Sequence, residues 1–225
     1  FAQQLRPGFD VDEFSEVFAM SVKYFYPEET GMLADPTEFK RVYTSDAMGL
    51  DNKWQLWTAD GKAASISIRG TSGRPESWLE NFYAAMIPAK GTLKLEPDFT
   101  FDYTLANNPR AAVHVGWLIA TAYLSRDILP KLDSCYQQGI KNFYINGHSQ
   151  GGAISYLMTA HLHHLQSAGR LPADIRFKTY ASAAPKPGNS YFAYDYNLLT
   201  QDGWGYNVVN PLDWVPETFL SVQKA

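Results

Sequence analysis

The sequence predicts an α/β protein, in which helices flank a mostly parallel sheet that begins with an antiparallel strand pair. Two observations indicate this fold class. The alternating apolar runs 53–58 and 63–69 are joined through Asp60-Gly61, a residue pair that favours tight hairpin turns. From residue 115 onward, helical and buried-strand patterns alternate, as they do in parallel sheets with helical crossovers. Because 225 residues with 45% hydrophobic content can bury one sizeable core, we expect a single domain over residues 1–225.

The remaining elements follow from local patterns. Apolar residues at helical spacing over 12–26, ahead of Pro27, predict the first helix. The stretch Ser77-Trp78-Leu79-Glu80 has a capping-box pattern and predicts a short amphipathic helix over 77–86. The other expected elements are helices over 115–132, 151–167 and 190–200, and strands over 142–146, 175–181 and 206–210.

Composition narrows the classes of partner and cofactor. The 19 basic and 23 acidic residues nearly balance and form no basic cluster, so we expect no nucleic-acid partner. Cys135 is the single cysteine, which excludes a disulfide within the chain and a thiolate metal cluster. No metal or cofactor is expected. No run approaches the ~18 apolar residues of a transmembrane helix. The chain starts at Phe1 without a methionine, from which we expect a processed, secreted or periplasmic protein.

The strongest motif is Gly147-His148-Ser149-Gln150-Gly151, which fits G-x-S-x-G. A buried-strand pattern precedes it and a helical pattern follows it. A serine at such a tight strand-to-helix turn presents its hydroxyl at the carboxyl end of the sheet, above the free NH groups of a helix N-terminus. The alternative is a chance match in a loop or an ordinary helix cap. The flanking patterns favour Ser149 as a nucleophile.

A serine nucleophile needs a base and a carboxylate that orients the base, and in this fold type the chain order is Ser, acid, His. Asp213 is the best acid, because it follows the expected strand 206–210 in a loop that reaches the catalytic edge. Its alternative role is an Asx-type turn residue between Pro211 and Pro216. Asp195 is a weaker candidate, because its mid-helix position suits an exposed or capping role.

Five blocks, "SIRGT", "VHVGW", "NGHSQGG", "ASAAPKPGNSYFA" and "VVNPLDWVP", occur in the order and spacing of one known family. Over about two thirds of its length the chain resembles the class 3 lipases, which are fungal-lipase-like α/β-hydrolases. The resemblance implies an α/β-hydrolase fold, with Ser149 as nucleophile and Asp213 as triad acid. It also implies an oxyanion hole formed by the backbone NH groups of Thr71 and Gln150. Gln150 replaces the bulky apolar residue of the family's "GHSLGG", a mild departure because the oxyanion contact uses the backbone.

In that family the segment after the oxyanion residue forms a lid over the site. In this chain Trp78, Phe82 and Met86 would lie on one stripe of the helix expected over 77–86. Such a stripe is also typical of ordinary core packing, so both a mobile lid and a packed helix remain open.

The histidines do not supply an obvious base. His148 precedes the nucleophile on its strand, so its side chain should point away from the serine hydroxyl. His161, the first of three histidines on the following helix, is about 18 Å along that helix at 1.5 Å per residue. His114 belongs to "VHVGW", where the family uses it structurally. Because no histidine follows Asp213, we expect that the sequence lacks either its C-terminal end, with the catalytic histidine, or the base itself.

The sequence therefore predicts a serine carboxylester hydrolase that cleaves acylglycerol-type or related esters through an acyl-enzyme on Ser149. Its expected partner is a small-molecule ester or lipid, including lipid at a lipid–water interface. The alternative of a different class is a lipid- or ester-binding pseudoenzyme that keeps the pocket and has lost its general base.

Overall fold

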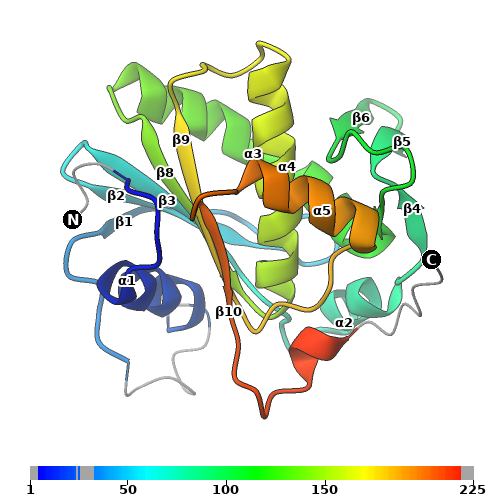
Figure 1. The fold of residues 1–225 in the computed structure, drawn as a ribbon, viewed down its shortest axis with the longest axis horizontal. Coiled ribbons are helices and arrows are strands. Elements are labelled where there is room, and N and C mark those ends of the chain that lie inside the picture. Colours follow the sequence, from blue (N-terminus) through cyan, green and yellow to red (C-terminus); the bar gives the residue numbers. More distant parts are fainter. Residues whose placement is uncertain (1–4, 24, 26–32, 219–225) are drawn as a thin grey trace.

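The computed structural model of the protein describes residues 5–23, 25 and 33–218. Phe1 to Gln4 lie outside the described residues. Within the described ranges, the main sheet has six strands in the order β1-β2-β3-β8-β9-β10 (Figure 1). Strand β2 is antiparallel to both of its neighbours, β1 and β3, and from β3 to β10 all neighbours are parallel. The strands are β1 (Lys40–Thr44), β2 (Trp54–Ala59), β3 (Ala63–Ile68), β8 (Asn142–His148), β9 (Arg176–Ser182) and β10 (Gly205–Val208).

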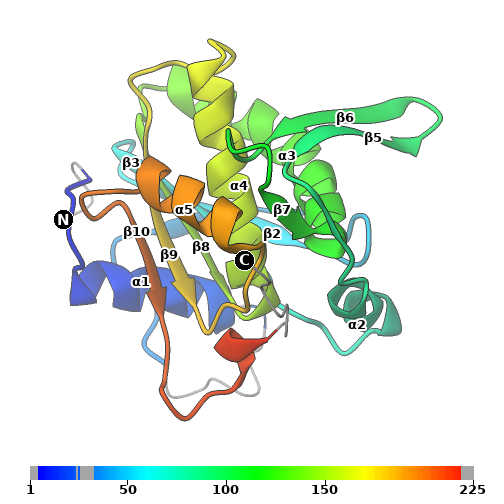
Figure 2. The same ribbon diagram turned by 45° about the vertical axis from the view of Figure 1, so that its right-hand side comes forward.

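Helices cover both faces of this sheet (Figures 1 and 2). One face carries α1 (Val11–Val22), and the other carries α3 (Val115–Gln137), α4 (Gln150–Ser167) and α5 (Ser190–Leu199). Each face has its own apolar core, the larger one lying under α3 and α4. The short helix α2 (Pro75–Phe82) and the 3₁₀ helix η1 (Val215–Glu217) follow β3 and β10 beyond their carboxyl ends. The predicted α/β fold with an antiparallel start is confirmed.

A buried polar cluster fixes α1 to the sheet. The Glu13 carboxylate accepts hydrogen bonds of 2.8 Å from the hydroxyls of Tyr144 on β8 and Tyr180 on β9. It also forms an ion pair with the ammonium group of Lys178, which is 1% exposed at its side chain. A charge this deeply buried is tolerated only when its partner and hydrogen bonds are in place. The contacts therefore set the position of α1 across β8 and β9.

Most predicted elements are confirmed with boundaries shifted by a few residues. The hairpin turn between β2 and β3 has positive φ at both Asp60 (44°) and Gly61 (68°), and Lys62 N donates to the Ala59 carbonyl. Helix α1 ends at Val22, earlier than predicted; Tyr24 and Tyr26, the end of the predicted range, lie outside the described residues.

The prediction missed five short strands between residues 40 and 114. These are β1 of the main sheet, a hairpin of β5 (Lys90–Glu96) and β6 (Phe99–Thr104), and a pair of β4 (Met86–Pro88) and β7 (Ala112–His114). The hairpin extends over α3 and α4 (Figure 2).

The short helix predicted after β3 is present, but its predicted range of 77–86 and its predicted capping box are wrong. The N-cap of α2 is Arg74, Pro75 occupies the first turn, and Ser77 lies inside the helix. The helix ends after Phe82, because Tyr83 has ψ near 60° and the chain then extends to pair with β7. Met86 is therefore a strand residue opposite His114, and it does not belong to the apolar stripe of the helix.

Candidate active site

The turn between β8 and α4 places Ser149 in a strained conformation. Its φ is 55° and its ψ is −125°, a region that residues other than glycine rarely adopt. The glycines on either side are required by close packing. A Cβ on Gly147 would lie 2.3 Å from the backbone of Gly151, and a Cβ on Gly151 would lie 2.3 Å from the carbonyl oxygen of Ile68. The motif therefore has the geometry of a nucleophile elbow.

The same close packing brings the end of β3 against the first turn of α4. Residues 69–72 leave β3 at this point, and the ion pair between Arg69 and Asp51 (2.7 Å) ties them to the loop before β2. The hydroxyl of Thr71 accepts a hydrogen bond of 2.9 Å from the side-chain amide of Asn81 on α2. The segment with Thr71 is thus held from two sides next to the elbow.

Gln150 is the first residue of α4, where backbone NH groups have no partner within the helix. Its side chain is 2% exposed, and its oxygen accepts a hydrogen bond of 3.2 Å from the Ser77 hydroxyl of α2. The expectation that only the backbone of Gln150 matters therefore misses a contact, because the side chain reaches α2.

Asp213 lies in the loop between β10 and η1, past the carboxyl end of the sheet, and is half-buried. Its carboxylate accepts a hydrogen bond of 3.0 Å from Val215 N, so the Asx-turn role is present. It also acts on His148: burial lowers the pKa of that imidazole, and the negative charge of Asp213 opposes the shift.

Asp195 has the capping role expected of it. Its carboxylate accepts hydrogen bonds from the backbone NH groups of Asn107 (2.6 Å) and Asn108 (2.8 Å). It therefore holds the chain between β6 and β7 against α5.

All five histidines fall in the described residues, and their contacts point to structural positions. Both ring nitrogens of His114 are engaged, with the Asn81 carbonyl and with Trp117 N. His148 Nδ1 is 3.0 Å from the Ser182 hydroxyl, and its ring packs against Phe18 of α1. The remaining three lie farther along α4. The ring of His161 packs against Phe101 and that of His163 against Phe177, and His164 is the next residue of the helix. Burial lowers the pKa of His114 and of His161 to about 4.

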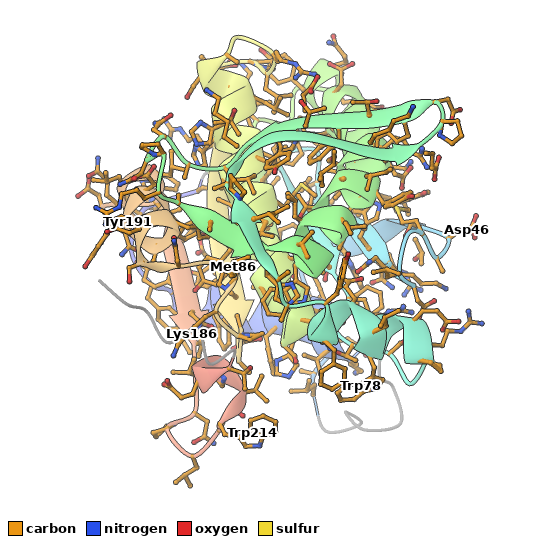
Figure 3. The ribbon with its side chains drawn as sticks, turned by 90° about the vertical axis from the view of Figure 1, so that its right-hand side faces the viewer. Asp46, Trp78, Met86, Lys186, Tyr191 and Trp214 are labelled. Atoms are coloured by element: carbon orange, nitrogen blue, oxygen red, sulfur yellow. The ribbon has the colours of Figure 1, made fainter. Side chains whose placement is uncertain are left out.

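The exposed side of α2 is apolar, and its buried side is polar. Trp78 is 51% exposed and Phe82 is 71% exposed, with their rings stacked on each other. The buried residues of the helix are Ser77 and Glu80. Trp214, in the loop after β10, is 72% exposed and lies at the same end of the molecule as Trp78 (Figure 3). The alternative that the stripe is ordinary core packing is thus wrong for Trp78 and Phe82.

Two hollows lie near these elements. One of about 420 Å³ lies beside α2 and is lined by apolar and aromatic side chains such as Leu50, Leu79 and Ile119. Another of about 520 Å³ lies between α5 and the segments around β10, with Val209 and Pro216 in its wall. Among the described residues, no group of three or more His, Cys, Asp or Glu side chains is arranged to hold a metal ion.

Comparison with known proteins agrees with this geometry. The sequence profile of "Lipase (class 3)" matches residues 65–223, which include the elbow, α2 and Asp213. The chain belongs to the class 3 lipase family. No curated protein matches the sequence at a significant level. Within the described ranges, no helix combines the length and apolar character needed to cross a membrane.

Solved lipase structures share the fold of this family member. The Rhizomucor miehei lipase propeptide complex matches with a TM-score of 0.64 at 20% identity, over 95% of this chain and 65% of that one. Lipase II from Rhizopus niveus matches with a TM-score of 0.62 at 19% identity, over 92% of this chain and 73% of that one. The lipase from Rhizopus microsporus var. chinensis matches with a TM-score of 0.60 at 19% identity, over 96% of this chain and 74% of that one. At these identities the likeness shows a common fold.

Sequence reasoning missed two polar residues of α2 that contact the site. Asn81 holds Thr71, and Glu80 is completely buried with a 2.6 Å hydrogen bond from Asn52. The one available signal was Glu80 itself, a charged residue that the sequence pattern assigned to a capping box. A helix pattern cannot reveal its neighbours, because they come from other parts of the chain.

Proposed function

We propose that this class 3 lipase family member is a serine carboxylester hydrolase with Ser149 as nucleophile. The observation that carries the proposal is the strained conformation of Ser149 between β8 and α4. A residue other than glycine is held in such a conformation only where the surrounding structure imposes it, and such strain is concentrated at functional sites. The position next to the first turn of α4 supports the same role.

In the proposed reaction, the Ser149 hydroxyl attacks the carbonyl carbon of an ester while a histidine accepts the hydroxyl proton. The carbonyl oxygen becomes an oxyanion that receives hydrogen bonds from the backbone NH groups of Thr71 and Gln150. Collapse of this intermediate breaks the bond to the alcohol, which leaves with the proton from the histidine. Water then hydrolyses the acyl-enzyme by the same steps and releases the carboxylic acid.

The base in this proposal is a histidine outside residues 1–225. Its support is the placement of the histidines among the described residues: His114 has both ring nitrogens engaged, His148 Nδ1 lies 3.0 Å from the Ser182 hydroxyl, and the other three lie farther along α4. Asp213 is the proposed acid, because its loop follows β10 at the carboxyl edge of the sheet and its charge acts on His148, the residue before Ser149. It would orient the incoming histidine and stabilise the imidazolium that forms.

The proposed substrate is an acylglycerol-type or related ester at a lipid–water interface. Support comes from the exposed apolar side chains at this end of the molecule, including Trp78, Phe82 and Trp214. Exposed aromatic residues that gather on one surface are typical of interaction sites. A protein that acts on such surfaces would suit a secreted or periplasmic location, which fractionation of the producing cells would test.

A phosphonate ester probe tests the assignment. The full-length protein should be labelled, and peptide mapping should find the adduct on Ser149. An adduct on another serine would contradict the proposal. The placement of the histidines also favours a second candidate, an ester-binding pseudoenzyme; it predicts binding of a lipid ester with neither labelling nor turnover by the full-length protein.

A further inference from the structure

The inner face of α2 makes polar contacts with the nucleophile elbow. Ser77 joins the two elements directly, because its hydroxyl donates to the Gln150 side chain (3.2 Å) and accepts from Ser72 N (3.1 Å). Ser72 is itself bound to Asp51 through its hydroxyl (2.6 Å). The side chain of Gln150, the residue after the proposed nucleophile, is therefore part of the attachment of α2.

Glu80 lies one helical turn further along the same face. Its side chain is fully buried, and Oε2 accepts a hydrogen bond of 2.6 Å from the Asn52 amide. Oε1 of Glu80 and Nε2 of Gln150 are both buried and have no hydrogen bond with the described residues. The two unsatisfied groups belong to residues that interact, since the side-chain amide of Gln150 lowers the pKa of the Glu80 carboxyl.

An uncharged carboxyl would satisfy these groups. Because Oε2 accepts from Asn52, the hydrogen of the acid would be on Oε1, where it needs an acceptor. The Gln150 amide offers its oxygen to Oε1 after a rotation by 180°, which exchanges its donor and acceptor ends. Its Nε2 would then donate to the Ser77 hydroxyl oxygen, so the contact with Ser77 would be kept with its direction reversed. An ionised Glu80 would instead leave a charge in a site where none of the described residues forms an ion pair with it, which is unfavourable.

Two further contacts join α2 to the site. Asn81 bridges the Thr71 hydroxyl and the indole NH of Trp117 on α3. Gly116 of α3 approaches so closely that a Cβ on it would lie 2.3 Å from the Glu80 carbonyl oxygen. Any displacement of α2 would therefore move its partners Asn81 and Ser77, and with them the segments of Thr71 and Gln150.

We propose that Glu80, in its uncharged form, is a positioning residue that fixes α2 against Gln150 and thereby holds the two oxyanion amides in place. This inference rests on the proposed function, because it concerns the backbone NH groups of Thr71 and Gln150. It makes the site sensitive to pH: when Glu80 loses its proton, a desolvated charge is buried between α2 and the elbow, the packing of α2 is destabilised, and the amides lose their alignment.

The charged groups around Glu80 support the direction of this effect. Burial raises the pKa of Glu80 to about 8, and the charge of Asp51 adds to the rise. The amides of Asn52 and Gln150 and the charge of Arg69 oppose it. On the α3 side, His114 at the start of that helix is neutral at pH 8, because burial lowers its pKa to about 4.

The sign for stability follows from the two pKa values. The folded protein keeps the Glu80 proton up to about pH 8, whereas the unfolded chain releases it near 4.5. The unfolded state thus binds fewer protons over this interval, and the free energy of unfolding falls as pH rises from about 4.5 to about 8. Above pH 8 this group adds no further change.

The first test needs no activity. Thermal unfolding of the full-length protein is measured from pH 5 to 9 for wild type, Glu80→Gln and Glu76→Gln, a matched control at an exposed position on α2. We expect the melting temperature of wild type and Glu76→Gln to fall relative to Glu80→Gln as pH rises to about 8. Should Glu80→Gln not fold, a ¹³C-carboxyl titration of wild type decides: a Glu80 pKa below 5 overturns the inference.

The second test measures kcat and KM on a soluble short-chain ester over the same pH range. We expect kcat of wild type and Glu76→Gln to fall above about pH 8 with KM little changed, and Glu80→Gln to keep its kcat. The same alkaline fall in Glu80→Gln would overturn the inference. Failure of the proposed function is distinguishable, because then Ser149→Ala and wild type have equal rates while the thermal and ¹³C measurements still report on Glu80.

Discussion

Helices α4 and α2 meet at the elbow, yet they bury opposite kinds of residue. Helix α4 is covered along most of its length and buries Ile154, Leu157 and Leu162 against β8, β9 and α3. Helix α2 buries Ser77 and Glu80 and exposes Trp78, Leu79 and Phe82. The difference shows that apolar periodicity fixes the orientation of a helix only where a core is available to receive it. At the site, hydrogen bonds to Gln150 and Asn52 set the orientation instead.

The largest effect is expected at the start of α4. Replacement of Ser149 by alanine should lower kcat by roughly 10⁶, the loss found when a serine hydrolase loses its nucleophile. The assay is hydrolysis of p-nitrophenyl butyrate by the full-length protein, with circular dichroism as a check of folding. Undiminished turnover in a folded Ser149→Ala variant would show that Ser149, at the start of α4, is not the nucleophile.

The next effect concerns the acid. Asp213→Asn in the full-length protein should reduce kcat by about 10⁴, because the amide favours the wrong histidine tautomer. Asp195→Asn is the matched control, since Asp195 binds backbone NH groups of the chain before β7. Kinetics of both variants decide between them: a nearly silent Asp213→Asn together with a damaging Asp195→Asn would reverse the assignment.

A pair of leucine substitutions measures the contrast between the helices directly. Leu157→Ala on α4 removes a fully buried side chain and should lower the free energy of unfolding by about 2–5 kcal/mol. Leu79→Ala on α2 removes a side chain that is 59% exposed and should change it by no more than about 0.5 kcal/mol. Urea unfolding of both variants gives the two values. Equal losses would mean that α2 is packed as firmly through its apolar side as α4.

The smallest effect is specific to lipid surfaces. Replacing Trp78 and Phe82 together by serine should slow hydrolysis of an emulsified triglyceride by roughly ten-fold, since two aromatic anchors are lost. Rates on a dissolved short-chain ester should not change. Leu198→Ser, at an exposed apolar position of α5, is the control. An equal loss of rate on both substrates would indicate that the substitutions damage the site, and that Trp78 and Phe82 have no role in binding the interface.

The elbow could be predicted from sequence because all of its determinants are local. Gly147, Ser149 and Gly151 lie within five positions, and each is explained by contacts of the turn itself or of the adjoining strand. The β2–β3 hairpin is similar, because Asp60-Gly61 supplies both positive φ angles. Local chemistry of this kind is readable without knowledge of the rest of the fold.

The surroundings of α2 could not be predicted, because they depend on distant segments. Glu80 meets Asn52 from the loop before β2 and Gln150 from α4, contacts that span 28 and 70 positions. Ser77 and Glu80 fit a capping box, but Pro75 begins the helix earlier and turns both side chains inward. Met86 was misassigned for the same reason: pairing with β7 overrides the helical pattern.

The positive φ of Ser149 also bears on how the sequence changes over generations. Strain at such a position typically opposes folding by about 1–3 kcal/mol, and glycine would relieve it. If the chain only bound esters, nothing would oppose a mutation that makes the protein more stable by giving up a side chain it does not use. A lineage without catalysis should therefore drift toward glycine at 149, and retention of serine there among relatives of this chain would support the proposed nucleophile.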